Sequence, residues 1–110
     1  TKMRPISAEC GDAIADADNV YVSFASAWEL EIKTALGRFT LEGDIEEGIA
    51  DSSFMPLPIS FAHLRRLRQL PHHHGDPFDR MLIAQAQVER LTLVTADTQL
   101  QAYDLPILMA

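Results

Sequence analysis

Three acidic side chains stand at comparable points of this sequence, each close to the expected end of an apolar strand or the start of a helix. Glu29 follows the β-branched stretch 20–22 by a few residues, and Asp97 directly follows the apolar stretch 91–95. Asp79 falls in the first turn of the longest predicted helix. Because ligands bind outside the carboxyl ends of strands in open α/β sheets, we expect these three carboxylates to converge at one edge of the sheet.

Carboxylates gathered in this way call for a cation. Like charges at close range raise one another's pKa, so the cluster stays ionised only when a cation such as Mg²⁺ or Mn²⁺ lies between them. Such an ion polarises a phosphate and makes hydroxide from bound water near neutral pH. Each acid also has a structural interpretation: Glu29 completes a capping box with Ser26, Asp79 favours a helix N-terminus, and Asp97 is an N-cap.

The elements that must position these residues alternate along the chain. Helical spacing and caps predict helices over 7–17, 26–36, within 42–51, 60–70 and 76–90, with a short helical turn from 97, and the β-branched or apolar runs predict strands at 20–22, 54–59, 91–95 and 106–109. Two prolines suit the strand at 54–59 to an edge position. This order predicts one α/β domain over 1–110, built around a mostly parallel sheet.

Composition limits the class of protein further. The net charge is -7, which argues against a broad basic surface for nucleic acid. Residues 1–55 hold 11 acids and 4 bases, whereas residues 56–110 hold 5 of each. Any surface that faces phosphate is therefore expected in the second half. One cysteine, Cys10, excludes an internal disulfide framework. No apolar run suggests a membrane span and no leader opens the chain, so the expected location is the cytoplasm.

Three segments carry a family resemblance. The segment 22–38, VSFASAWELEIKTALGR, looks like the strand-then-WEI segment of VapC-like PIN domains. The segment 73–86, HHGDPFDRMLIAQA, resembles their HRDPFDRLLIAQA block, and 91–97, LTLVTAD, is similar to their LTLVTxD. The three segments occur in the family's order, and the resemblance covers essentially the whole chain.

The resemblance implies a three-layer PIN-like sandwich and a metal-dependent endoribonuclease of the VapC toxin type. It implies that Glu29, Asp79 and Asp97 are catalytic and metal-site acids for Mg²⁺ or Mn²⁺, with Thr95 supporting them as a hydroxyl hydrogen-bond donor. It further implies an RNA substrate, a homodimer and a cognate VapB-like antitoxin.

The sequence departs from the family pattern at its start. Family members open with an apolar strand that ends in a metal-binding Asp and lies centrally in the sheet, and no such segment stands here. We therefore expect the central N-terminal strand to be missing, because the chain is a fragment, because a partner supplies the strand, or because the sheet closes around the gap. The ribonuclease is then weak or inactive in this form. The alternatives are a degenerate, non-catalytic module for dimerisation or antitoxin binding and, with less support, another Mg²⁺-dependent phosphoesterase.

Other side chains carry secondary predictions. Adjacent histidines at 72–74 are usually polar loop residues, but with Asp76 they also suit a transition metal, or they contact the RNA backbone. Arg80, beside Asp79, is a candidate for phosphate contact through its guanidinium fork. The arginines at 65, 66 and 68 form a solvated helix face or touch RNA, and Trp28 is expected in core or dimer packing.

Overall fold

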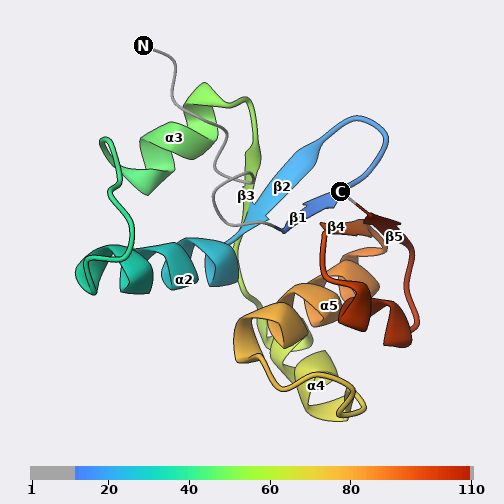
Figure 1. Ribbon diagram of the computed structural model, residues 1–110. Coiled ribbons are helices and arrows are strands. Elements are labelled where there is room, and N and C mark those ends of the chain that lie inside the picture. The colour runs from blue at the N-terminus through green and yellow to red at the C-terminus, as the bar shows by residue number, and fades with distance from the viewer. Residues whose placement is uncertain (1–11, 110) are drawn as a thin grey trace.

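The computed structural model describes residues 12–109, which form an α/β fold (Figure 1). In chain order the elements are β1 (Ala13–Ala15), β2 (Val20–Ser23), α2 (Phe24–Ala35), α3 (Ile45–Asp51), β3 (Met55–Leu57), α4 (Phe61–Gln69), α5 (Pro77–Glu89), β4 (Thr92–Thr95), the 3₁₀ helix η1 (Thr98–Ala102) and β5 (Ile107–Met109). No helix within the described residues has the length and apolar content needed to cross a membrane.

The five strands of the described chain make one sheet in the order β3-β2-β1-β4-β5. β2 pairs with β3 and β4 pairs with β5 in parallel, whereas β1 pairs antiparallel with both β2 and β4. Four strands therefore point one way and the central strand points the other, so the predicted α/β fold with a mostly parallel sheet is confirmed. Pro56 lies in β3 at the edge, as its missing N–H requires.

The middle of the sheet is where the sequence prediction was wrong. A helix was expected over 7–17, but Ala13–Ala15 is a strand that fills the centre, so the expected gap is not found. The physical reason is pairing: without β1 the facing edges of β2 and β4 would each be left unsatisfied. The Asp16 carboxylate accepts from the backbone N–H groups of Asp18 and Asn19 at 2.8 and 2.7 Å and closes the turn into β2. The first part of the predicted helix and Cys10 lie outside the described residues.

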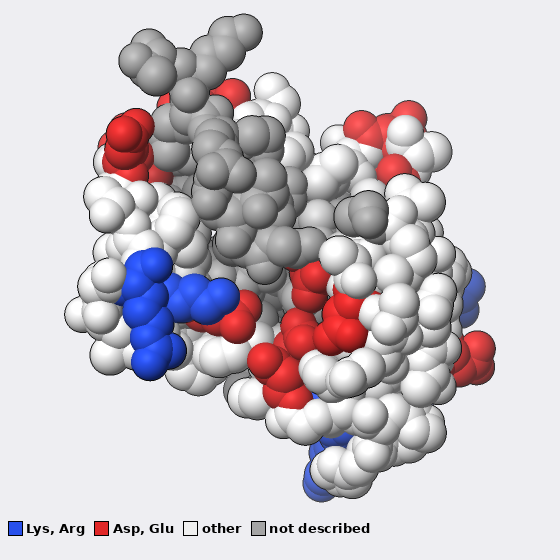
Figure 2. Space-filling model, in the orientation of Figure 1, with Lys and Arg blue, Asp and Glu red and all other residues white. Residues whose placement is uncertain are grey.

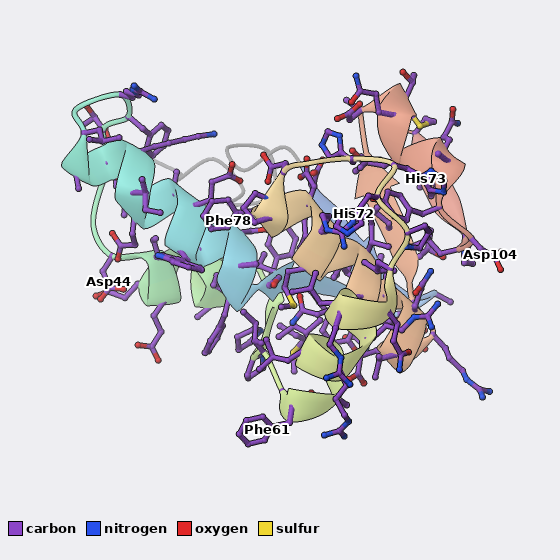
Figure 3. All side chains as sticks on the ribbon, turned by 90° about the horizontal axis from the view of Figure 1, so that it is seen from below. Asp44, Phe61, His72, His73, Phe78 and Asp104 are labelled. Atoms are coloured by element: carbon purple, nitrogen blue, oxygen red, sulfur yellow. The ribbon has the colours of Figure 1, made fainter. Side chains whose placement is uncertain are left out.

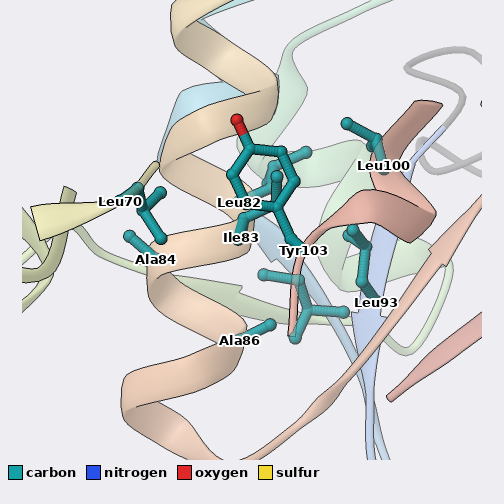
Figure 4. Close-up of a cluster of buried hydrophobic side chains, with 9 residues drawn as sticks. Leu70, Leu82, Ile83, Ala84, Ala86, Leu93, Leu100 and Tyr103 are labelled. Atoms are coloured by element: carbon teal, nitrogen blue, oxygen red, sulfur yellow. The ribbon is translucent and has the colours of Figure 1, made fainter. Parts of the chain in front are cut away.

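Two apolar clusters cover the two faces of the sheet, which makes three layers. The α5 cluster joins α5 and η1 to β1 and β4 (Figure 4); it consists of Ile14, Leu70, Leu82, Ile83, Ala84, Ala86, Leu93, Leu100 and Tyr103. The α3 cluster joins α2 and α3 to β2; it consists of Val22, Leu30, Ile45 and Ile49. Tyr21 packs on the first cluster and Val22 belongs to the second, as alternation along a strand requires.

The start of α2 corrects the predicted capping box. The N-cap is Ser23, whose Oγ accepts from the Ala25 N–H at 2.9 Å, so Glu29 lies in the helix interior and has no capping role with Ser26. The Ser23 hydroxyl also donates to Oε1 of Gln85 in the centre of α5 at 2.5 Å, and both residues are fully buried. This contact fixes α2 against α5. The other predicted helices agree with the structure within a few residues, and α5 has the expected Asp76 N-cap and Pro77.

Candidate metal centre

Acidic side chains gather at the sheet edge where β2 and β4 end. Figure 2 shows them in the middle of one face of the molecule. Two aromatic rings join the helices beside this edge, because Trp28 of α2 and Phe78 of α5 pack edge to face with centroids 5.1 Å apart. Since each ring belongs to the residue just before an acid, this packing brings Glu29 and Asp79 toward the same region.

The tightest group at this edge consists of His74, Asp79 and Asp97. Nε2 of His74 lies 2.9 Å from Oδ2 of Asp79 and 3.8 Å from Oδ2 of Asp97. One donor atom from each of the three residues lies within 4.8 Å of the other two. The side chains of His74 and Asp79 are only 15% and 18% exposed. The structure thus brings together two of the three predicted acids and adds a histidine.

The carboxyl of Asp79 is the most perturbed acid of the group. Its pKa is raised to about 7, chiefly by burial; a hydrogen bond with Asp12 and the charges of Asp12 and Asp76 contribute to this rise, and the hydrogen bond with His74 opposes it. Without a cation, Asp79 therefore retains a proton up to near-neutral pH. A divalent ion beside Asp79 would compete with that proton.

Asp97 both caps a helix and lies in the candidate site. Its Oδ1 accepts from the Gln99 N–H at 2.9 Å and caps η1, as predicted, while its Oδ2 faces His74. Thr95 is fully buried, and its Oγ1 accepts from the Asp97 N–H at 3.1 Å. The threonine hydroxyl thus holds the backbone that carries Asp97, through an accepted bond where a donated one was expected.

Glu29 lies at the margin of this group. Burial raises its pKa, the charges of Asp76 and Asp12 raise it further, and Lys33 lowers it from one helical turn away, with 4.0 Å between Nζ and Oε2. Its carboxylate is not among the three donors that lie within 4.8 Å of one another. Glu29 therefore shares the electrostatic field of the edge without joining the tight group.

Asp12 belongs to this edge and was not singled out from the sequence. It directly precedes β1, whose first residue Ala13 is level with Val94 of β4. Because β1 runs antiparallel, its beginning lies at the carboxyl ends of its neighbours, and the side chain of Asp12 hydrogen-bonds Asp79. No local signal could have found Asp12, because its place depends on the direction of β1.

The loop that carries His74 is tied to the core. The Tyr103 hydroxyl accepts from the backbone N–H groups of His73 and His74 at 3.2 and 3.0 Å, and Tyr103 is 4% exposed. The ring of His73 packs edge to face on Tyr103, and Figure 3 shows His72 and His73 along this loop. Asp76 was considered as a co-ligand of the histidines. Its Oδ1 accepts hydrogen bonds from the N–H groups of Phe78 and Asp79. Within the histidine run only His74 joins the clustered acids, and it does so with Asp79 and Asp97, whereas Asp76 is not among the clustered donors.

Arg80 does not take the phosphate-facing position expected of it. Arg80 is 9% exposed, and its guanidinium donates to the Tyr103 hydroxyl and to backbone oxygens of Leu67, Leu70 and Pro71, with N–O distances between 2.8 and 3.4 Å. The oxygens of Leu70 and Pro71 lie just past the last turn of α4, where carbonyls have no partner within the helix, and the oxygen of Leu67 also accepts from the Leu70 N–H at 3.2 Å. The arginine therefore joins the end of α4 to the His74 loop. On the same helix, one residue before Leu67, Arg66 donates to Oε1 of Gln87 in the C-terminal half of α5, away from Asp79 at its start.

The donor set fits a divalent cation. An ion with ligands at about 2.1 Å holds neighbouring donor atoms roughly 3 to 4 Å apart. The distances of 2.9 and 3.8 Å from Nε2 of His74 to the two carboxylates match this spacing, and the donor atoms of Asp79 and Asp97 lie within 4.8 Å of each other. Carboxylate oxygens suit Mg²⁺ and Mn²⁺, and imidazole suits transition metals. Among the described residues, Lys33 is paired with Glu29 and Arg80 is directed to backbone carbonyls, so neither side chain neutralises Asp79 or Asp97.

Comparison with known proteins identifies one family. The family model described as PIN domain matches residues 2–105. A search of curated proteins found no match.

Proposed function

The chain belongs to the PIN domain family, a family of nucleases, and on that premise we propose that it is a metal-dependent endoribonuclease of the VapC toxin type. The observation that supports this most is the convergence of Asp79, Asp97 and His74 at the carboxyl edge of the sheet, within the spacing of one metal ion. Asp12 and Glu29 add negative charge to the same edge.

The proposed metal ligands are Asp79 and Asp97, with Asp12 beside them, and the ion is Mg²⁺ or Mn²⁺. A divalent cation held there would neutralise charge on a phosphodiester and lower the pKa of a water molecule, which is the chemistry of phosphodiester hydrolysis. The chain's own contribution is placement. Thr95 fixes the backbone of Asp97, and the N-cap Asp76 fixes the turn that carries Asp79.

Glu29 has a different role in this proposal. With its carboxylate outside the tight group and its pKa raised by burial and by neighbouring acids, it is placed to accept or hold a proton beside the ion, not to bind the ion as tightly as Asp79 does. All these carboxylates lie at the end of the sheet where β2 and β4 finish, so an RNA strand would approach the molecule there. The bound cation would offset the repulsion between the acids and the RNA phosphates.

The partners proposed are a second copy of the chain and a VapB-like antitoxin, acting in the cytoplasm. The supporting observation is the exposed apolar row of α2, where Phe24, Trp28 and Leu36 are 48%, 61% and 60% exposed. Beside this row lies a hollow of about 820 Å³ between α2 and α3, with acidic residues Glu31 and Asp44 among its lining. An apolar surface of this kind favours a protein partner.

Cleavage of a labelled single-stranded RNA tests the proposed activity. The wild-type chain should cleave the RNA with Mn²⁺ or Mg²⁺ and stop with EDTA, and Asp79→Asn should lose at least about 100-fold in rate because a metal ligand is removed. Asp104→Asn is the matched control, because Asp104 is exposed and is not among the clustered donors; Figure 3 shows it well away from Phe78, the residue before Asp79. Equal cleavage by Asp79→Asn would refute the shared site. A chain that binds Mn²⁺ but leaves RNA intact would favour the alternative, a non-catalytic module.

A further inference from the structure

A Mg²⁺ site is normally built from oxygen donors alone. The group at this edge also contains His74, so it offers one imidazole nitrogen beside its carboxylate oxygens. We propose that His74 is a direct metal ligand through Nε2, and that the site consequently selects a first-row transition ion such as Mn²⁺ over Mg²⁺. This inference rests on the proposed function, since it concerns the same site and names its ion.

The first support is geometric. Nε2 lies 2.9 Å from the nearer oxygen of Asp79 and 3.8 Å from that of Asp97, so the imidazole nitrogen occupies the same small volume as the two carboxylates. Such separations are those of neighbouring ligands around one ion. In contrast, the carboxylate of Glu29 does not meet this condition.

The second support is that the histidine is held in place. Tyr103, itself bonded by Arg80, accepts from the N–H of His74 at 3.0 Å and ties the loop to the core. The side chain of Gln99 hydrogen-bonds His74 as well. The Tyr103 bond therefore holds the backbone of the loop, and the Gln99 bond holds the side chain of His74, as outer hydrogen bonds commonly do for ligating histidines. His72, in the same loop, is exposed and has none of these contacts among the described residues.

The third support is donor chemistry. Imidazole is a good ligand for transition ions and a poor one for Mg²⁺, which prefers oxygen. Replacing one oxygen ligand by nitrogen therefore shifts the preference of the site toward the transition series. The competing interpretation is that His74 is only a protonated counter-ion for Asp79 and Asp97, in which case an arriving cation would displace it.

Electron spin-echo spectroscopy of the Mn²⁺-loaded chain separates these two interpretations, because it detects nitrogen bound to manganese. We expect ¹⁴N coupling in the wild type, converted to ¹⁵N coupling by histidine labelled with ¹⁵N. The coupling should vanish in His74→Gln and remain in His72→Gln, the matched control from the same loop. The wild-type measurement needs no variant, so the test does not depend on the folding of His74→Gln.

Calorimetry supplies the second readout. His74→Gln should weaken Mn²⁺ binding by at least about tenfold and change Mg²⁺ binding less, so that the ratio of the two affinities falls. Mn²⁺ binding without nitrogen coupling, with an unchanged affinity ratio in His74→Gln, would overturn the role of His74 and leave the carboxylate site intact. Absence of Mn²⁺ binding by the wild type would overturn the proposed function together with this inference.

Discussion

Replacing Arg80 by methionine tests whether this arginine organises the site loop or contacts a phosphate. Methionine keeps much of the side-chain length and removes the guanidinium. The Tyr103 hydroxyl and the carbonyl oxygens of Pro71, Leu67 and Leu70 then lose their shared donor. Because Arg80 is 9% exposed, water replaces that donor only in part.

The magnitude follows from the four distances. The bonds to Pro71 and Tyr103 are 2.8 and 3.1 Å long, whereas both bonds to Leu67 and Leu70 measure 3.4 Å and contribute little. A hydrogen bond from a charged donor contributes about 1.5 kcal/mol at the low end. Two such bonds give a loss of about 3 kcal/mol in the free energy of unfolding, which is a large part of the total of about 5–15 kcal/mol for a domain.

Urea unfolding followed by circular dichroism measures this loss. Arg65→Met is the control, because Arg65 is exposed on α4 and its replacement should change the free energy of unfolding by less than about 0.5 kcal/mol. A loss below about 1 kcal/mol for Arg80→Met, together with a weaker salt dependence of RNA binding, would refute the structural role and favour the phosphate contact.

Three further predictions concern the acids and the α2 surface. Asp12→Asn should weaken Mn²⁺ binding about 10- to 100-fold in calorimetry, whereas Asp18→Asn, in the exposed turn at the other end of β1, should not; equal affinities would exclude Asp12 from the site. In the metal-free protein the folded-state pKa of Asp79 is about 7, so the unfolded chain ionises first and the wild type loses stability as the pH rises from about 4 to about 7. Asp79→Asn removes this loss, so in EDTA its free energy of unfolding relative to wild type should rise over that interval, and a constant difference would contradict the assignment. Trp28→Ser should raise the dimer dissociation constant at least about tenfold in light scattering, because Trp28 is 61% exposed and offers a large apolar contact; an unchanged constant would place the dimer surface elsewhere.

The parts of the fold that sequence could predict depend on local signals. Asp76-Pro77 marks the start of α5, Ser60 caps α4, and Pro56 places β3 at an edge. The centre of the sheet could not be predicted in this way. Ala13–Ala15 has helix-favouring composition and becomes a strand because β2 and β4 both offer unpaired edges to it.

The candidate site shows the same division. Asp79 was found from its place in the first turn of a helix and Asp97 from its place directly after a strand, and the structure brings the two together. Asp12 depends on a reversed strand, and His74 depends on a tyrosine 29 residues away that holds its loop. Arg80 was misjudged because its neighbour in sequence is the acid, whereas its partners in space are carbonyl oxygens.

Anomalous diffraction from crystals of the chain soaked in Mn²⁺ tests the central claim most directly. We expect one strong manganese peak between the carboxylates of Asp79 and Asp97, next to Nε2 of His74. A peak only at another acidic turn, such as Asp44 with Glu46 at the start of α3, or no peak at saturating Mn²⁺, would contradict the claim that this edge of the sheet is a metal centre.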